Sequence, residues 1–143
     1  MSVDEVLNQK VQEAMEEFAF ISTVATDDEA SSYNGPVAMV ELHAPVEGQF
    51  ILCAPKELLQ ELVDFAGGGM LDSDSWDAQK DMLAEVANLI AGQIQSAYEA
   101  EVTIGLPVVD ENASVECALR RFETESTSFW AAVKDAKSAE HAA

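Results

Sequence analysis

Basic residues are scarce in this sequence, and their scarcity excludes several classes of partner. Seven lysines and arginines face 27 aspartates and glutamates, which gives a formal net charge of −20. A surface of that sign repels the phosphates of nucleic acids and anionic lipids, so we expect neither nucleic acid nor a membrane as a partner. The chain also lacks an apolar run of the roughly 18 to 20 residues that a membrane-spanning helix needs.

Cysteine and histidine are equally few. Cys53 and Cys117 lie in apolar, strand-like contexts and are expected to be buried thiols of a reducing compartment. His43 and His141 are too scattered to suggest a metal site, so we expect this chain to bind no metal or cofactor. The first residues lack the basic start and apolar core of a signal peptide, and we therefore expect a cytoplasmic protein.

What the sequence does contain suits one domain with a single core. It has 143 residues, of which 48% are hydrophobic but only 7% aromatic, so aliphatic side chains must do most of the packing. We expect the domain to span residues 1–133. Residues 134–143 are alanine-rich and charged, and are expected to form a frayed tail.

Apolar periodicity and turn residues predict the elements and the fold class. Helices are expected over residues 3–18, 55–67 and 75–99, strands over 19–25, 37–44, 49–54, 102–109, 114–122 and 126–133, and turns or loops over 27–36 and 110–112. The three glycines at 67–69 follow a helix and are interpreted as its end rather than as a phosphate loop. This order predicts an α+β domain with one mixed or antiparallel sheet of about six strands and helices packed on one face.

The second long helix carries the most informative residues of the chain. At about 100° per residue, Asp81, Glu85 and Asn88 fall on one stripe, opposite the apolar side of the helix. Gly92 and Ser96 continue this stripe. A glycine inside a helix costs about 1 kcal/mol relative to alanine, which is easier to explain if another molecule approaches this face closely. The pattern indicates a polar helix surface that contacts a partner.

These residues resemble the signature of a known family. The run Asp81-x-x-x-Glu85-x-x-Asn88, followed by Ile90-Ala91-Gly92, is similar to that of the CheC/CheX/FliY chemotaxis phosphatases. Its single copy on the second long helix is most like CheX. The run Ile-Gly-Leu-Pro-Val-Val at 104–109 and the strand around 48–52 also lie where this family has them, and the resemblance covers residues 18–133.

The resemblance implies a phosphatase that hydrolyses the aspartyl-phosphate of a CheY-like response regulator. Such a regulator supplies its own Mg²⁺ and a lysine, so what remains to be provided is an aligned attacking water. Asn88 would hold that water in line through its carboxamide, and Glu85 would pair with the regulator's lysine. Asp81 would either contact the partner or hold Glu85.

The same resemblance bears on docking. Met82 and Leu89 flank the stripe and are expected to supply apolar contacts to the partner, while Gly92 and Ser96 would let another helix come close. The alternative is a non-catalytic adaptor that binds a response regulator, or a flagellar or signalling partner, through the same helix. A small-molecule binding domain is a weaker alternative, because no charged or aromatic cluster supports it.

Two further expectations concern a second copy of the helix motif and the assembly of the chain into a dimer. A second Glu-x-x-Asn, at Glu5 and Asn8, is not followed by Ala-Gly and is interpreted as coincidence. CheX-like proteins form homodimers, and the predicted sheet has open edges that need covering, so the resemblance implies a homodimer. The sequence leaves open which regulator is recognised and in which signalling pathway.

Overall fold

The chain folds into three helices and seven strands, which the computed structural model describes over residues 2–44, 46–98 and 103–137. In chain order the elements are α1 (Val3–Ala19), β1 (Val24–Ala30), β2 (Tyr33–Ala44), β3 (Glu47–Cys53), α2 (Lys56–Gly67), α3 (Trp76–Ser96), β4 (Thr103–Ile104), β5 (Val108–Val115), β6 (Leu119–Glu123) and β7 (Ser128–Lys137). Among the described helices, none combines the length and apolar character that crossing a membrane requires.

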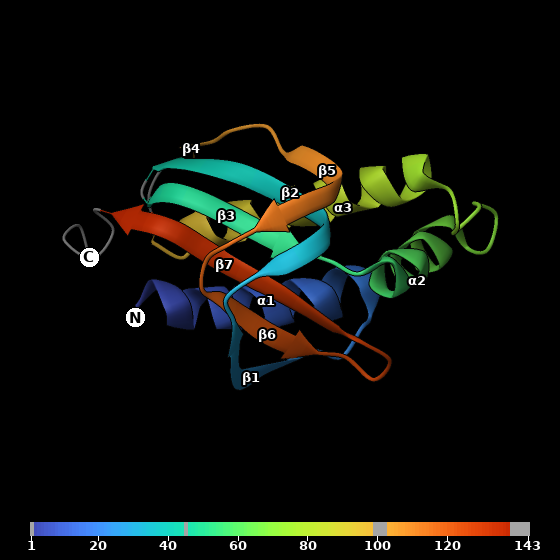
Figure 1. Cartoon of the computed structure of the whole chain (residues 1–143), viewed down its shortest axis with the longest axis horizontal. Coiled ribbons are helices and arrows are strands. Elements are labelled where there is room, and N and C mark those ends of the chain that lie inside the picture. Colours follow the sequence, from blue (N-terminus) through green and yellow to red (C-terminus); the bar gives the residue numbers. More distant parts are fainter. Residues whose placement is uncertain (1, 45, 99–102, 138–143) are drawn as a thin grey trace.

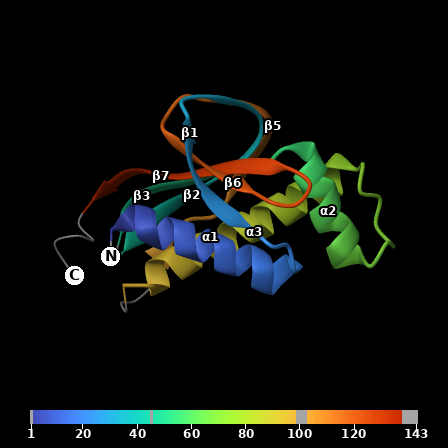
Figure 2. The ribbon, with the colours of Figure 1, turned by 90° about the horizontal axis from the view of Figure 1, so that it is seen from below.

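The strands form one antiparallel sheet in the order β1-β6-β7-β3-β2-β4, and β5 also pairs with β2. Helices α1 and α3 lie side by side on one face of this sheet, and α2 packs at one end (Figures 1 and 2). The predicted α+β class, with helices covering one sheet face, is confirmed. The hairpin expected from the strands at 37–44 and 49–54 is also present as the pairing of β2 with β3.

The sheet has one strand more than expected because its edge beside β2 is interrupted. The strand predicted over residues 102–109 is divided into β4, which pairs through Ile104 with Leu42, and β5, which pairs through Val108 with Met39. The break falls at Pro107, which has no N–H to donate to a neighbouring strand. β4 and β5 are therefore two parts of one edge of the sheet, separated by residues 105–107, which belong to neither strand.

The acidic segments were assigned wrongly from sequence. Residues predicted as a loop at 27–36 contribute to β1 and β2, the turn predicted at 110–112 lies inside β5, and the strand predicted at 19–25 begins only at Val24. Among the described strands, β1 and β5 each pair with one neighbour only, and the three acidic side chains of β1 are exposed on the surface of the sheet. Polarity at an edge strand was mistaken for polarity of a loop.

Two helix and strand ends also differ from prediction. α1 continues through Ala19 and ends at Phe20, whose left-handed backbone (φ 53°) places its N–H on the Glu16 carbonyl at 3.1 Å. β7 continues to Lys137, so the first part of the predicted tail is a strand paired with β3. Residues 138–143 of that tail lie outside the described residues.

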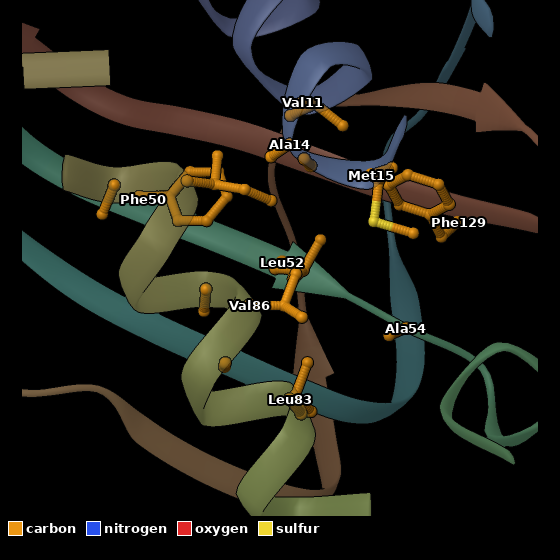
Figure 3. Packing of buried hydrophobic residues seen from close by; sticks show 14 of the residues in the cluster. Val11, Ala14, Met15, Phe50, Leu52, Ala54, Leu83, Val86 and Phe129 are labelled. Carbon is orange, nitrogen blue, oxygen red and sulfur yellow. The ribbon is translucent and has the colours of Figure 1, made fainter. Parts of the chain in front are cut away.

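The larger hydrophobic core lies between the helices and the sheet. Figure 3 shows Val11, Ala14 and Met15 of α1 and Leu83 and Val86 of α3 pointing into the space against β3 and β7. All five side chains are at most 2% exposed. Because each buried aliphatic side chain contributes about 1.5–3 kcal/mol, this packing fixes the rotation of α3 about its own axis.

A second, smaller cluster covers the opposite face of the sheet. It is formed by Val37, Ile51, Cys53, Val115, Leu119 and Ala132. The rings of Tyr33 and Trp130 pack over it with centroids 5.6 Å apart. Both cysteines are free thiols, Cys53 fully buried as expected and Cys117 only half-buried.

Candidate functional site

The long helix α3 starts from a well-defined cap. Ser75 adopts an extended backbone, and its Oγ accepts a hydrogen bond from the Ala78 N–H at 3.4 Å. Asp77 lies in the first turn, where a negative charge interacts favourably with the helix dipole. Asp72, in the preceding loop, accepts from the Asp74 N–H at 3.0 Å and takes no part in the cap.

The outward face of α3 carries the predicted stripe. Asp81, Glu85, Asn88 and Ser96 are exposed, and Gly92 is half-buried between them. The opposite face is sealed in the core, with Leu83, Val86, Ala87, Ile90, Ala91 and Ile94 at most 2% exposed. The carboxylate and the carboxamide therefore project away from the molecule from a helix that is held along its whole inner side.

Glu85 and Asn88 have no hydrogen bond or ion pair to any other described residue through their side chains. They lie three positions apart, which places their side chains as neighbours on the helix surface. Ser96, further along the stripe, donates its hydroxyl to the Gly92 carbonyl at 2.9 Å. The polar atoms of Glu85 and Asn88 are thus available to another molecule.

The flanking apolar residues behave differently from each other. Met82 is 7% exposed and belongs to the larger core, so the partner contact expected from it does not fit the structure. Met82 lies four residues before Val86, which places it on the buried side of the helix. Leu89 is half-buried against the core and keeps part of its surface outside, so its partner contact stays a prediction.

No internal contact of the described residues explains the glycine at position 92. A Cβ placed there would meet no atom outside its own helix segment within 4 Å. Alanine would fit in the isolated molecule and would favour the helix by about 1 kcal/mol. The absence of a side chain therefore leaves a shallow step in the outer surface of α3 that the fold itself does not need.

Two buried glutamines that hold α3 in place were not recognised in the sequence. Gln95 is 0% exposed; its Oε1 accepts from the Val46 N–H at 2.8 Å, and its Nε2 donates to the Val46 carbonyl at 2.9 Å. Gln79 is 2% exposed and donates to the Ser73 carbonyl at 2.7 Å. These side chains tie the two ends of α3 to loops. In the sequence, both glutamines lie at helix positions whose spacing otherwise carries apolar residues, and this spacing is the pattern that indicates their burial.

The second Glu-x-x-Asn, on α1, differs from the first in how its asparagine is presented. Asn8 is half-buried, and its Oδ1 is enclosed without a hydrogen-bond partner among the described residues. Asn88, in contrast, is exposed. This difference agrees with the interpretation of the copy on α1 as coincidence.

The chemistry that the α3 stripe offers is that of an amide beside a carboxylate. An amide donates and accepts hydrogen bonds without titrating, so it can orient a water molecule, and a carboxylate can pair with a cation. Among the described residues, no group of three or more histidine, cysteine or acidic side chains is placed to hold a metal ion. The stripe is therefore suited to complete a reactive centre that another molecule supplies.

Comparison with known proteins gives consistent results. The profile of a family described as chemotaxis phosphatase CheX matches residues 36–130. The chain is similar in structure to a chemotaxis protein CheX from Desulfovibrio desulfuricans, with a TM-score of 0.76 and 17% identity over 92% of this chain and 97% of that one. A chemotaxis protein CheX from Vibrio vulnificus gives a TM-score of 0.72 and 12% identity over 90% of this chain and 95% of that one.

A third similar structure is a CheX-CheY-BeF3-Mg²⁺ complex from Borrelia burgdorferi. The TM-score is 0.62 and the identity 16%, over 91% of this chain and 94% of that one. A search of curated proteins gives no match. At these identities the solved structures show a shared fold, and function has to be argued from the site.

Proposed function

Since this chain belongs to the family of the chemotaxis phosphatase CheX, as its helix signature predicted, we propose that it removes the phosphoryl group from the aspartyl-phosphate of a CheY-like response regulator. The single observation that carries the proposal is the exposed, unengaged pair Glu85 and Asn88 on the outer face of α3. The complex of a CheX with a CheY from Borrelia burgdorferi supports the choice of partner.

The proposed role of Asn88 is to align the attacking water. Hydrolysis of an acyl phosphate needs a nucleophile held in line with the leaving oxygen, while the charge on the phosphoryl oxygens is neutralised by Mg²⁺ and a cation. The regulator would supply both of these. The Asn88 carboxamide, reaching out from α3, can accept from one proton of the water and fix the direction of its lone pair.

The proposed role of Glu85 is to fix the position of this chain relative to the regulator. Its carboxylate would pair with the lysine of the regulator, which places Asn88 one turn further along the helix beside the phosphoryl group. Asp81 lies one turn before Glu85 on the same stripe and would extend this contact. The step at Gly92 and the small side chain of Ser96 would accept a helix of the regulator at the other end.

The test measures phosphate loss from a phosphorylated CheY-like domain in the presence of Mg²⁺. The unmodified chain should accelerate the loss, and Asn88→Ala should reduce this acceleration by about 100-fold, the scale of effect that misplaced reacting groups produce. Asn112→Ala is the matched control, because Asn112 is also an exposed asparagine but lies on β5.

Both variants should unfold at the same temperature as the unmodified chain, since neither side chain is buried. Equal rates for the unmodified chain and Asn88→Ala would contradict the proposed role. A complex that forms without any change in the phosphoryl lifetime would instead establish a non-catalytic adaptor.

We also propose that the chain forms a homodimer through the edge made by β4 and β5. Among the described strands, the outer sides of β1, β4 and β5 have no neighbour. β1 carries three acids in succession, Asp27, Asp28 and Glu29, against two on β5, Asp110 and Glu111, so like-charge repulsion opposes pairing with a second copy more strongly at β1. The other edge presents Leu106 and Val108, which are 87% and 62% exposed, and is therefore favoured.

A further inference from the structure

The residue that ends α1 is unusual for its position. Phe20 has a left-handed backbone with φ 53° and ψ 33°, a conformation that glycine normally supplies at the end of a helix. For a residue with a side chain it costs about 1–2 kcal/mol. The side chain is nevertheless a phenyl ring that is 78% exposed. Burial within this molecule does not explain an aromatic residue at this position.

Phe20 contacts one other aromatic side chain, Phe65 of α2. The ring centroids are 5.4 Å apart and the rings meet edge to face, at 72°. Phe65 is itself 44% exposed. The pair therefore forms an apolar surface between the end of α1 and α2. Figure 2 shows these two helices meeting at one end of the ribbon.

Beside this pair lies a groove of about 270 Å³. One wall is formed by Phe20, Ile21 and Ser22, and the other by Glu61 of α2 and by Thr124, Glu125 and Ser126 in the turn between β6 and β7. Its volume is below the range of about 300–1,000 Å³ that is usual for pockets that bind small molecules. It is suited to a side chain of a partner rather than to a cofactor.

The charge of this groove has one sign. Glu61 and Glu125 line it, Asp64 is exposed next to Phe65, and no lysine or arginine is among its described lining residues. Ser126 donates its hydroxyl to Oε1 of Glu61, which holds that carboxylate at the wall of the groove. An apolar surface bordered by carboxylates favours a cationic partner.

We infer that the groove between Phe20, Glu61 and Glu125 is a second docking surface, for a peptide segment of a partner protein that carries an apolar side chain next to lysine or arginine. The apolar side chain would fill the groove and the cation would pair with Glu125 or lie over a phenyl ring. No residue of α3 lines the groove. This inference therefore stands whether or not the stripe on α3 is catalytic.

The test uses a short amphipathic peptide of leucine and lysine, and a second peptide in which glutamate replaces lysine. Binding to the full chain is measured by fluorescence anisotropy, and its place by amide shifts in NMR spectra. The lysine peptide should bind and shift the amides of Ser22 and of residues 124–126, whereas the glutamate peptide should not bind. Asn88→Ala should bind the lysine peptide as the unmodified chain does.

Two pairs of variants distinguish peptide binding in the groove from general attraction of a cationic peptide to an acidic protein. Phe20→Gly should lower affinity at least tenfold while the chain stays folded, because glycine is the favoured residue at this backbone conformation. Glu125→Gln should also lower affinity. The controls Met70→Ala and Asp27→Asn change an exposed apolar residue and an exposed acid that lie outside both the groove lining and the proposed dimer edge, and should leave affinity unchanged. Equal losses in controls and groove variants, or amide shifts confined to α3, would overturn the inference.

Discussion

Individual residues on the outer face of α3 contribute to its surface and not to the packing beneath it. Glu85 and Asn88 are exposed, and the residues between them, Val86 and Ala87, are buried. Changes on the stripe should therefore alter contacts with a partner and leave stability nearly unchanged, since exposed substitutions usually stay within about 0.5 kcal/mol. Gly92 is the informative exception.

Gly92→Ala should make the chain more stable and its proposed docking weaker. Removing the flexibility of glycine stabilises a helix by about 0.4–1 kcal/mol where the site has room, and the surroundings of Gly92 leave that room. The added methyl group would fill the step that the regulator's helix is expected to enter. We expect about a tenfold loss of affinity, equivalent to about 1.4 kcal/mol.

Urea unfolding and titration with the phosphorylated regulator measure the two effects. Ser96→Ala, which adds no bulk, should leave docking nearly unchanged. Unaltered affinity in Gly92→Ala would show that the partner does not approach this part of the helix.

Helix α3 is positioned by an apolar face and by two amides near its ends. The apolar face was predictable from the sequence, because its period of about 3.6 residues needs no knowledge of neighbouring elements. The amides were not, because glutamine is usually exposed and the partner of Gln95 is Val46, 49 residues away in sequence. Edge strands such as β1 were missed for a related reason: an acidic sequence reveals its pairing only when the neighbouring strand is known.

Gln95→Ala should destabilise the chain by breaking both hydrogen bonds to Val46. The buried N–H and carbonyl of Val46 would each lose a partner, at about 1–3 kcal/mol for a group left unsatisfied. Gln93→Ala is the control on the same helix, since Gln93 is half-buried and makes no side-chain hydrogen bond with the described residues. Urea unfolding should show a clear loss for the first variant only. Equal stabilities of the two would mean that the amide does not anchor α3.

For the whole molecule, the net charge of −20 opposes any contact between two copies. A dimer must therefore gain its stability from apolar and backbone contacts at the sheet edge, and salt should strengthen it by screening the repulsion. Regulator binding, if it pairs Glu85 with a lysine, should respond to salt in the opposite direction.

Val108→Asp should convert the proposed dimer to a monomer. The change places a charge on the exposed outer side of β5, where Val108 is 62% exposed in the single chain. Sedimentation at micromolar concentration measures the outcome, with Val24→Asp as the control, because Val24 is similarly exposed, at 57%, on the opposite edge strand β1. A monomer in the unmodified chain, or a dimer that survives Val108→Asp, would exclude this edge.

Because the sheet is packed on both faces, Cys53 can report how the molecule opens. Burial raises the pKa of this thiol to about 12, so at neutral pH it is almost entirely protonated and unreactive until it is exposed. Phe50 and Leu52 face the helices while Ile51 and Cys53 face the smaller cluster, so one strand serves both layers. We expect a thiol-specific reagent to modify Cys117 first and Cys53 only at the rate of global unfolding, as one cooperative unit requires. If Cys53 were labelled as fast as Cys117, the outer layer would be fluctuating independently of the layer that holds α3.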